Sequence, residues 1–141
     1  MAHSDATAEV SRKFGFVPGQ IIQEFYFDDD VDMELRSDIE SLTGEELVDE
    51  DFTNTTDAAI IWWRAEDAEV DELSDLLVDA IGNLDDGGDI WVLTPKAGRD
   101  QYVSSVDIED AASTAGLHAS GTIDAATDWM GMRLVVRAPR V

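Results

Sequence analysis

Three basic side chains follow two apolar segments in a chain that is otherwise strongly acidic. Arg64 comes after "AIIWW" (59–63), and Lys96 and Arg99 come after "DIWVLTP" (89–95). If both segments are parallel strands, these cations lie at the sheet edge where open α/β folds bind ligands. They would then suit a small anionic metabolite. The alternative is that each cation pairs with one of the many nearby carboxylates and needs no ligand.

Tryptophan and arginine side chains point to a different chemistry, that of a protein interface. Trp62 and Trp63 end one predicted strand, and successive strand residues face opposite sides, so each should pack toward a different layer. We expect at least one of them in the core, with Arg64 and the loop after it exposed. Arg133 follows Trp129 in the sequence. Trp129 either exposes its ring at the sheet edge or caps the core.

Motifs for catalysis, metal binding and cofactor binding are missing from the sequence. There is no cysteine, and the two histidines, His3 and His118, lack the spacing of metal ligands. Neither a nucleophile elbow nor a glycine-rich phosphate loop occurs. Carboxylates are so numerous that no pair stands out as an acid–base dyad. We therefore predict no catalytic residue, metal or cofactor, and lean against an enzyme.

The charge of the chain excludes two classes of partner. Thirty-two acidic residues face nine basic ones, giving a net charge of −23, and the segment 24–89 contains 24 acids and only two bases. Nucleic acid and anionic lipid would be repelled. The plainest interpretation is a solvated surface that confers solubility. Two more specific interpretations of the acidic surface are that it recruits a basic protein and that it mimics nucleic acid.

Length and hydropathy indicate one cytoplasmic domain. The chain has 141 residues and no apolar run long enough to cross a membrane. The N-terminal segment has neither the basic nor the apolar region of a secretory signal. Residues 1–12 are small and polar and predict a flexible tail, followed by a single domain over 13–141.

Apolar periodicity predicts alternating strands and helices. Strands are expected at 20–27, 57–63, 89–95, 118–124 and 131–138, with a short one within 45–51; helices are expected at 28–42, 69–84 and 105–117, and a turn at 85–88. This order predicts an α/β three-layer sandwich with a mainly parallel sheet and right-handed crossovers. The last two strands lack a helix between them and should form an antiparallel hairpin at the C-terminal edge.

Part of this pattern resembles the second half of a class I methyltransferase. The resemblance lies in the strand "DAAIIWW" (57–63), the helix "VDELSDLLVDAIGNL" (70–84) and the turn "DDGGDIWVL" (85–93). It implies a Rossmann-like fold. Methyltransferases have a glycine-rich loop after their first strand, but here "IIQEFYF" runs into "DDDVD" with no glycine between Gly19 and Gly44. The missing glycines and the three aspartates argue against an S-adenosylmethionine or dinucleotide site.

The stretch from Lys13 to Arg137 also resembles an actinobacterial family of short proteins known only as a domain of unknown function. The shared motifs are "GFVPG" (15–19), "GDIWVLTPK" (88–96) and "WMGMRL" (129–134). This resemblance implies a Rossmann-like fold and supplies no activity.

The function we expect is therefore non-catalytic. The protein would bind and regulate another protein, such as a larger metabolic enzyme or complex, through Trp63, Arg64, Lys96, Arg99, Trp129 and Arg133. One alternative is a sensor of a small anionic metabolite or a degenerate methyltransferase-like enzyme. Another is a nucleic-acid mimic that binds a basic protein.

Overall fold

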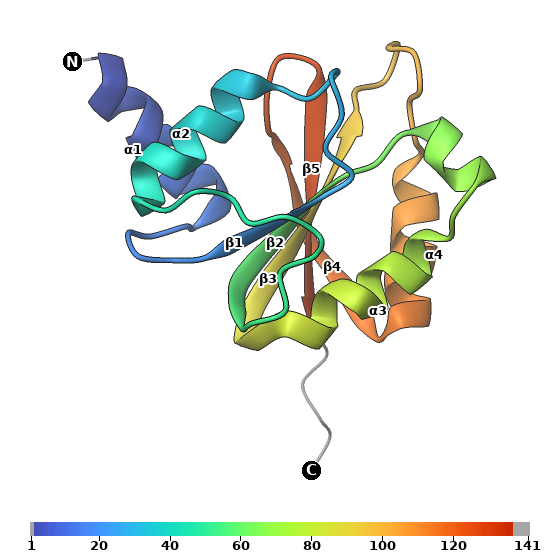
Figure 1. The fold of residues 1–141 in the computed structure, drawn as a ribbon. Coiled ribbons are helices and arrows are strands. Elements are labelled where there is room, and N and C mark those ends of the chain that lie inside the picture. Colours follow the sequence, from blue (N-terminus) through green and yellow to red (C-terminus); the bar gives the residue numbers. More distant parts are fainter. Residues whose placement is uncertain (1, 137–141) are drawn as a thin grey trace.

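A five-stranded sheet lies between helices α1 and α2 on one face and α3 and α4 on the other (Figure 1). The computed structural model describes the backbone of residues 2–136 and the side chains from residue 7 onward. The strands are β1 (Ile22–Phe25), β2 (Thr56–Trp62), β3 (Leu84–Pro95), β4 (Leu117–Asp124) and β5 (Trp129–Val136). The helices are α1 (Ala2–Phe14), α2 (Met33–Thr43), α3 (Leu73–Asn83) and α4 (Ser105–Ala115), with a 3₁₀ helix, η1, at Ala65–Glu69.

The strand order is β1-β2-β3-β5-β4. The pairs β1–β2 and β2–β3 are parallel, whereas β5 runs antiparallel to both β3 and β4. The α/β class and the antiparallel hairpin at the C-terminal edge are thus confirmed. The predicted last strand ends at Val136, and its final two positions, 137–138, lie outside the described residues.

The sheet separates two apolar cores because alternate residues of its central strands face opposite layers. Ile60 and Trp62 of β2 pack toward α1 and α2, whereas Ile61 and the adjoining Trp63 pack toward α3 and α4. Every residue of β2 except Asp57 is buried. This burial on both faces explains the continuous apolar run. It also confirms that Trp62 and Trp63 pack in different layers.

The connections between parallel strands share one hand. After α2 the chain returns to the outer side of β1, where Val48 forms a parallel bridge with Gln23, and only then crosses to β2. The connection from β1 through α2 to Val48 moves along the sheet in the opposite direction to the connection from β2 through α3 to β3. Helix α2 also lies on the opposite face of the sheet from α3. Because both the direction and the face are reversed, the two connections have the same hand, as expected from the strong preference for a single crossover hand. The bridge at Val48 is what remains of the short strand predicted within 45–51.

Capping residues fix the helix ends that position the loops. The carboxylate of Asp32 accepts a hydrogen bond from the backbone N–H of Leu35, and Gly44 ends α2 with a φ of 76°. Ser104 caps α4 in the same way, and Gly116 ends it with a φ of 87°. Glycine adopts this left-handed conformation without a steric penalty, which explains why both helices end at a glycine.

Two local predictions are wrong. Residues 2–12 of the expected flexible tail belong to α1, and residue 1 lies outside the described residues. Val10 and Phe14, one helical turn apart, are 4% and 3% exposed and pack in the core beside α2. The expected turn at 85–88 lies within β3. Thr56 pairs with Leu84 and Ala58 with Asp89, so these four residues bulge out of the ladder without ending the strand.

Candidate functional site

The carboxyl ends of β1 and β2 meet at the edge where open α/β sheets bind ligands. Two loops rise from this edge: residues 26–32, between β1 and α2, and residues 63–72, which contain η1 and lead to α3. The crevice between the two loops is therefore the candidate functional site.

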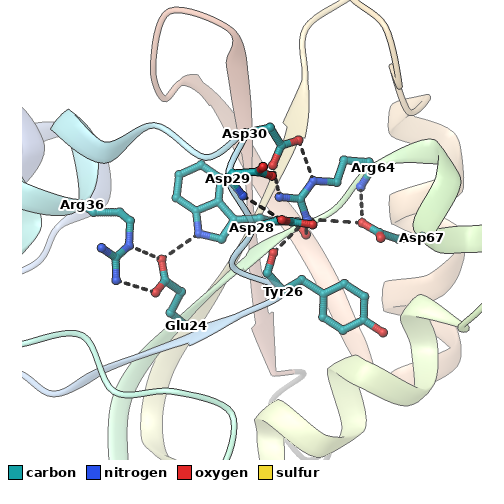
Figure 2. A network of polar contacts seen from close by, with 9 residues as sticks. Glu24, Tyr26, Asp28, Asp29, Asp30, Arg36, Arg64 and Asp67 are labelled. Carbon is teal, nitrogen blue, oxygen red and sulfur yellow. Dashed lines mark hydrogen bonds and ion pairs between the residues drawn. The ribbon is translucent and has the colours of Figure 1, made fainter.

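The side chain of Arg64 fills this crevice (Figure 2). Its guanidinium is paired with the carboxylate of Asp30 through both Nε and Nη2, and its Nη1 lies 3.4 Å from Asp67. Nη1 also donates to the backbone carbonyls of Tyr26 and Trp62 at 2.8 and 2.9 Å. These contacts tie the loop after β1 to the end of β2, and Arg64 is only 3% exposed.

The expectation that Arg64 is exposed is therefore wrong. Its pKa is raised because the hydrogen bonds and charges of Asp30 and Asp67 outweigh the opposing effect of burial, which is the largest single contribution. A guanidinium with this many short contacts has few donors left for a ligand. The metabolite site that required Arg64 beside Lys96 and Arg99 does not form.

Glu24 forms a second buried network next to the first. Its carboxylate accepts two hydrogen bonds from Arg36, at 2.6 and 2.8 Å, and a third from the indole N–H of Trp62 at 2.9 Å (Figure 2). Glu24 is 6% exposed, so its charge is buried but fully paired. The bond to Glu24 raises the pKa of Arg36, and the same guanidinium lies 4.7 Å from the ring of Phe27.

Tyr26 stands at the end of β1 in a backbone conformation that favours glycine. Its φ is 62°, which costs a bulky residue free energy and is held here by surrounding contacts. Its ring packs 5.4 Å from that of Trp63, and its hydroxyl donates to Asp71. Burial, followed by the hydrogen bond to Asp71, raises the pKa of the Tyr26 phenol well above its ordinary value.

Acidic side chains surround the rest of the crevice. Hydrogen bonds from Asp29 hold the pKa of Asp28 below its ordinary value, and the charge of Arg64 acts in the same direction. Glu50, from the segment after the Val48 bridge, accepts a hydrogen bond from the backbone N–H of Tyr26 at 2.7 Å. These carboxylates would repel a phosphate or pyrophosphate group.

The other cations named from the sequence each have a partner of their own. Lys96 pairs with Asp124 at 2.8 Å, and Arg99 with Asp128 at 2.9 Å. Arg133 pairs with Asp89 at 2.8 Å across the neighbouring strands β5 and β3. The structure therefore does not gather these cations into one anion site.

Both tryptophans proposed as interface residues are buried. Trp63 is 2% exposed and lies in the core under α3 and α4. Trp129 is 4% exposed, and its ring meets Trp62 edge to face at 4.9 Å and lies 5.4 Å from the guanidinium of Arg64. Of the two alternatives for Trp129, capping the core is the one observed, and neither ring is available to a partner.

Four open pockets lie beside or beyond the Arg64 crevice, and Arg64 itself lines none of these four. A pocket of about 380 Å³ separates the N-terminal ends of α3 and α4, and one of about 480 Å³ lies between α4 and the ends of β3, β4 and β5. Tyr102, which our sequence analysis did not single out, lines both and is 48% exposed. A third, of about 380 Å³, lies between α1 and α2, and a smaller one of about 230 Å³ is bordered by Glu24 and Glu50.

Two further properties of the described residues bear on the type of site. No three histidine, aspartate or glutamate side chains among residues 7–136 converge in a way that could hold a metal ion. No helix within the described part of the chain is long and apolar enough to cross a membrane.

The layout of sheet and helices is that of the Rossmann-like class I methyltransferases. It matches magnesium protoporphyrin IX methyltransferase from Synechocystis with bound S-adenosylmethionine over 96% of this chain and 78% of that one (TM-score 0.56, 11% identity). The pyocyanin biosynthetic protein PhzM matches over 92% of this chain and 53% of its own (TM-score 0.65, 12% identity). At such low identity the likeness concerns the fold alone.

The chain belongs to the DUF3052 family, described as proteins of unknown function, whose model matches residues 11–138. It is 40% identical over 132 residues to the uncharacterized proteins Rv2239c of Mycobacterium tuberculosis and Mb2263c of Mycobacterium bovis. Each match covers 94% of this chain and 81% of the relative. Both the family resemblance and the actinobacterial relatives expected from the motifs are confirmed.

The residues at the end of β1 do not fit S-adenosylmethionine. A cofactor in that crevice would need close backbone approach, which glycine allows. Here the side chain of Tyr26 stands at the first loop position and packs against Trp63, and Arg64 occupies the space beside it.

Proposed function

We propose that this protein is a non-catalytic cytoplasmic protein that binds and regulates another protein, such as a larger metabolic enzyme or complex. The surface that best supports such a role is the groove between η1, the start of α3 and the start of α4, which we call the α3–α4 groove. It is lined by Trp63, Ala65, Ala68, Asp71, Glu72, Leu73, Ser74, Tyr102, Val103, Asp107, Ile108 and Ala111.

The single observation that carries the proposal is the exposure of apolar side chains at this groove. Two exposed valines adjoin lining residues in the chain without lining the groove themselves. Val70, next to Asp71, is 82% exposed, and Val106, next to Asp107, is 59% exposed. Tyr102 adds an aromatic ring that is 48% exposed. Exposed apolar patches with a polar rim are typical of interaction surfaces.

The rim of the groove specifies the charge of the partner. Asp71, Glu72 and Asp107 line it, and the whole chain has a net charge of −23. Complementary charge accelerates association and selects among partners, so the partner should present basic side chains around an apolar centre. The contacts first expected from Trp63, Arg64 and Trp129 are replaced in this proposal by Val70, Tyr102 and Val106.

The closed crevice at the end of β1 supports a role without catalysis. Arg64 uses its donors within the protein, and Tyr26 stands where a cofactor-binding loop needs glycine. A domain that keeps the layout of an enzyme family without this loop is suited to binding.

Affinity capture from lysate of the source organism, with the protein tagged, tests this function. We would compare the unmodified protein with Val70→Lys, which places a positive charge at the groove, and with the control Val78→Lys on α3. Val78 is 54% exposed, and its chain neighbours Leu77 and Asp79 do not line the groove, whereas Val70 adjoins the lining residue Asp71. A stoichiometric partner retained at moderate salt, lost with Val70→Lys and kept with Val78→Lys, is the expected result.

Two outcomes would contradict the proposal. Capture of no stoichiometric partner at low or moderate salt would remove its basis. Capture only at low salt, equally affected by both substitutions, would indicate attraction by overall charge and favour the nucleic-acid mimic, since salt screens exposed charges.

A further inference from the structure

The pocket of about 480 Å³ between α4 and the sheet, which we call the β3–α4 pocket, has a composition unlike the rest of the surface. Its floor is formed by the carboxyl end of β3 and the neighbouring residues of β5 and β4. Its wall is the first turn of α4 and the loop before it. The lining residues are Thr94, Lys96, Ala97, Tyr102, Val103, Ser105, Ile108, Thr122, Met130, Gly131 and Met132.

No acidic side chain lines the β3–α4 pocket. The other three pockets described above are each lined by at least three carboxylates. In a chain with 32 acidic residues and a net charge of −23, a concave surface with one cation and no acid is unusual. The local environment therefore tolerates a negative charge that the rest of the surface repels.

Thr94 provides a polar side chain that lines this pocket. The residue is 8% exposed, and its side chain makes no hydrogen bond with any described residue. Thr94 shares the face of Ile90 and Val92, which pack toward α3 and α4, because residues two apart on a strand point the same way. The hydroxyl is not one of the fully buried polar atoms without a partner, so it is accessible and can bond to water or to a ligand.

Further hydrogen-bond donors border the same space. Lys96 lines both this pocket and the pocket between α1 and α2. Its ammonium pairs with Asp124, whose side chain is 68% exposed, and this one bond leaves two of its three hydrogens. Ser105 begins α4, and no described residue accepts a hydrogen bond from its backbone N–H. The apolar part of the wall comes from Val103, Ile108 and Met132.

We propose that the β3–α4 pocket binds a small monocarboxylate with an apolar body, such as an aromatic or medium-chain acid. The carboxylate lies between Thr94, Lys96 and the start of α4, and the apolar body packs against Met130, Met132 and Ile108. Pockets of this volume with apolar walls and a few convergent polar groups are the usual form of small-molecule sites.

The donors and the charge together select a monocarboxylate over other ligands. A neutral hydrocarbon would leave the hydroxyl of Thr94 and the remaining hydrogens of Lys96 without acceptors. A phosphate or diphosphate would bring two or more negative charges to a pocket that has one cation, within a strongly negative protein. One carboxylate matches both the donors and the single positive charge.

Titration calorimetry and amide chemical shifts of the full-length protein test the site with defined probes. The probes are 3-phenylpropanoate and octanoate, with 3-phenylpropanamide as the uncharged equivalent and phenyl phosphate as the more highly charged one. We expect saturable binding of the two carboxylates, with the largest amide shifts in residues 94, 96–97, 102–108 and 130–132. The amide and the phosphate should bind at least about tenfold more weakly.

Two substitutions separate the polar contacts. Thr94→Val removes the hydroxyl at constant shape and should weaken carboxylate binding about fivefold, and Lys96→Gln should weaken it about tenfold. Lys13→Gln is the matched control, because Lys13 also pairs with a carboxylate, that of Glu9 at 3.4 Å, but lines only the pocket between α1 and α2. Circular dichroism establishes that each variant is folded.

The results that would overturn the proposal are specific. They are the absence of saturable carboxylate binding by the unmodified protein, equal binding of acid and amide, and equal weakening by Lys96→Gln and Lys13→Gln. None depends on the capture of a protein partner. The failure of this proposal and the failure of the proposed function are therefore distinguishable.

Discussion

Replacing Arg64 by methionine tests whether its buried guanidinium holds the crevice closed. Arg64 is 3% exposed and donates to the carbonyls of Tyr26 and Trp62, as well as pairing with Asp30 and Asp67. Methionine keeps much of the apolar volume. It leaves the two carbonyls without their donor and the two carboxylates without their cation.

The structure sets the size of the expected loss. Removing one partner of a buried ion pair costs about 3–5 kcal/mol. The Asp30 side chain is 51% exposed and regains water when Arg64 is removed, which reduces the cost. We therefore expect the free energy of unfolding to fall by about 3 kcal/mol, most of it from the carbonyls and Asp67. For a domain of this size the melting temperature falls by roughly 10 °C.

Urea unfolding followed by tryptophan fluorescence measures this loss. The matched control is Arg99→Met, which breaks the Arg99–Asp128 pair, whose side chains are 51% and 61% exposed. An exposed pair contributes less than about 1 kcal/mol. If Arg64→Met lowers the free energy of unfolding no more than Arg99→Met does, the contacts of Arg64 do not stabilise the crevice and our account of its closure is wrong.

Two further predictions concern glycine and pH. Gly82→Ala, at the penultimate residue of α3 with open space around the new methyl group, should stabilise the protein by about 0.5 kcal/mol, whereas Gly44→Ala, at a φ of 76°, should destabilise it by about 1 kcal/mol. Thermal melts give both signs, and a loss with Gly82→Ala would contradict the packing of α3. Because the pKa of Tyr26 is raised in the folded state, its contribution to stability is complete below about pH 10 and decreases as the pH rises above that value. The urea concentration at the midpoint of unfolding should therefore fall less between pH 9 and 11 for Tyr26→Phe than for the unmodified protein. If the midpoints of both proteins fall equally with pH, this prediction is wrong.

The parts of the fold that the sequence predicts well are those set by local pattern. The continuous apolar run within 57–63 predicts a strand that is buried on both faces, as β2 is. The apolar residues at helical spacing in α3 predict a helix that is buried on one face. The helix stops at Gly44 and Gly116 follow from the conformation that each turn requires. The segment after β1 has no glycine before Gly44, and this departure from the methyltransferase pattern is visible in residues adjacent in the chain.

The features that the sequence does not predict depend on distant partners. Val10 and Phe14 form a short helical repeat in a polar segment, and only contact with α2 and Trp91 shows that the segment is ordered. Residues 85–88 have the composition of a turn, but Leu84 still pairs with Thr56. Arg64 follows an apolar strand and is expected in solvent, but its main partner, Asp30, lies 34 residues earlier in the chain.

The same dependence on distant partners explains why net charge is a poor guide to where this protein binds a ligand. A net charge of −23 excludes polyanions on average, yet Thr94, Lys96 and Thr122 come from three separate stretches of chain and meet in a pocket without an acid. The pairing of β3 with β5, and of β5 with β4, brings them together. Asp124, the partner of Lys96, is 68% exposed, so a ligand carboxylate can compete with it at little cost. The local arrangement of donors, more than the overall charge, therefore determines which anion this protein can accept.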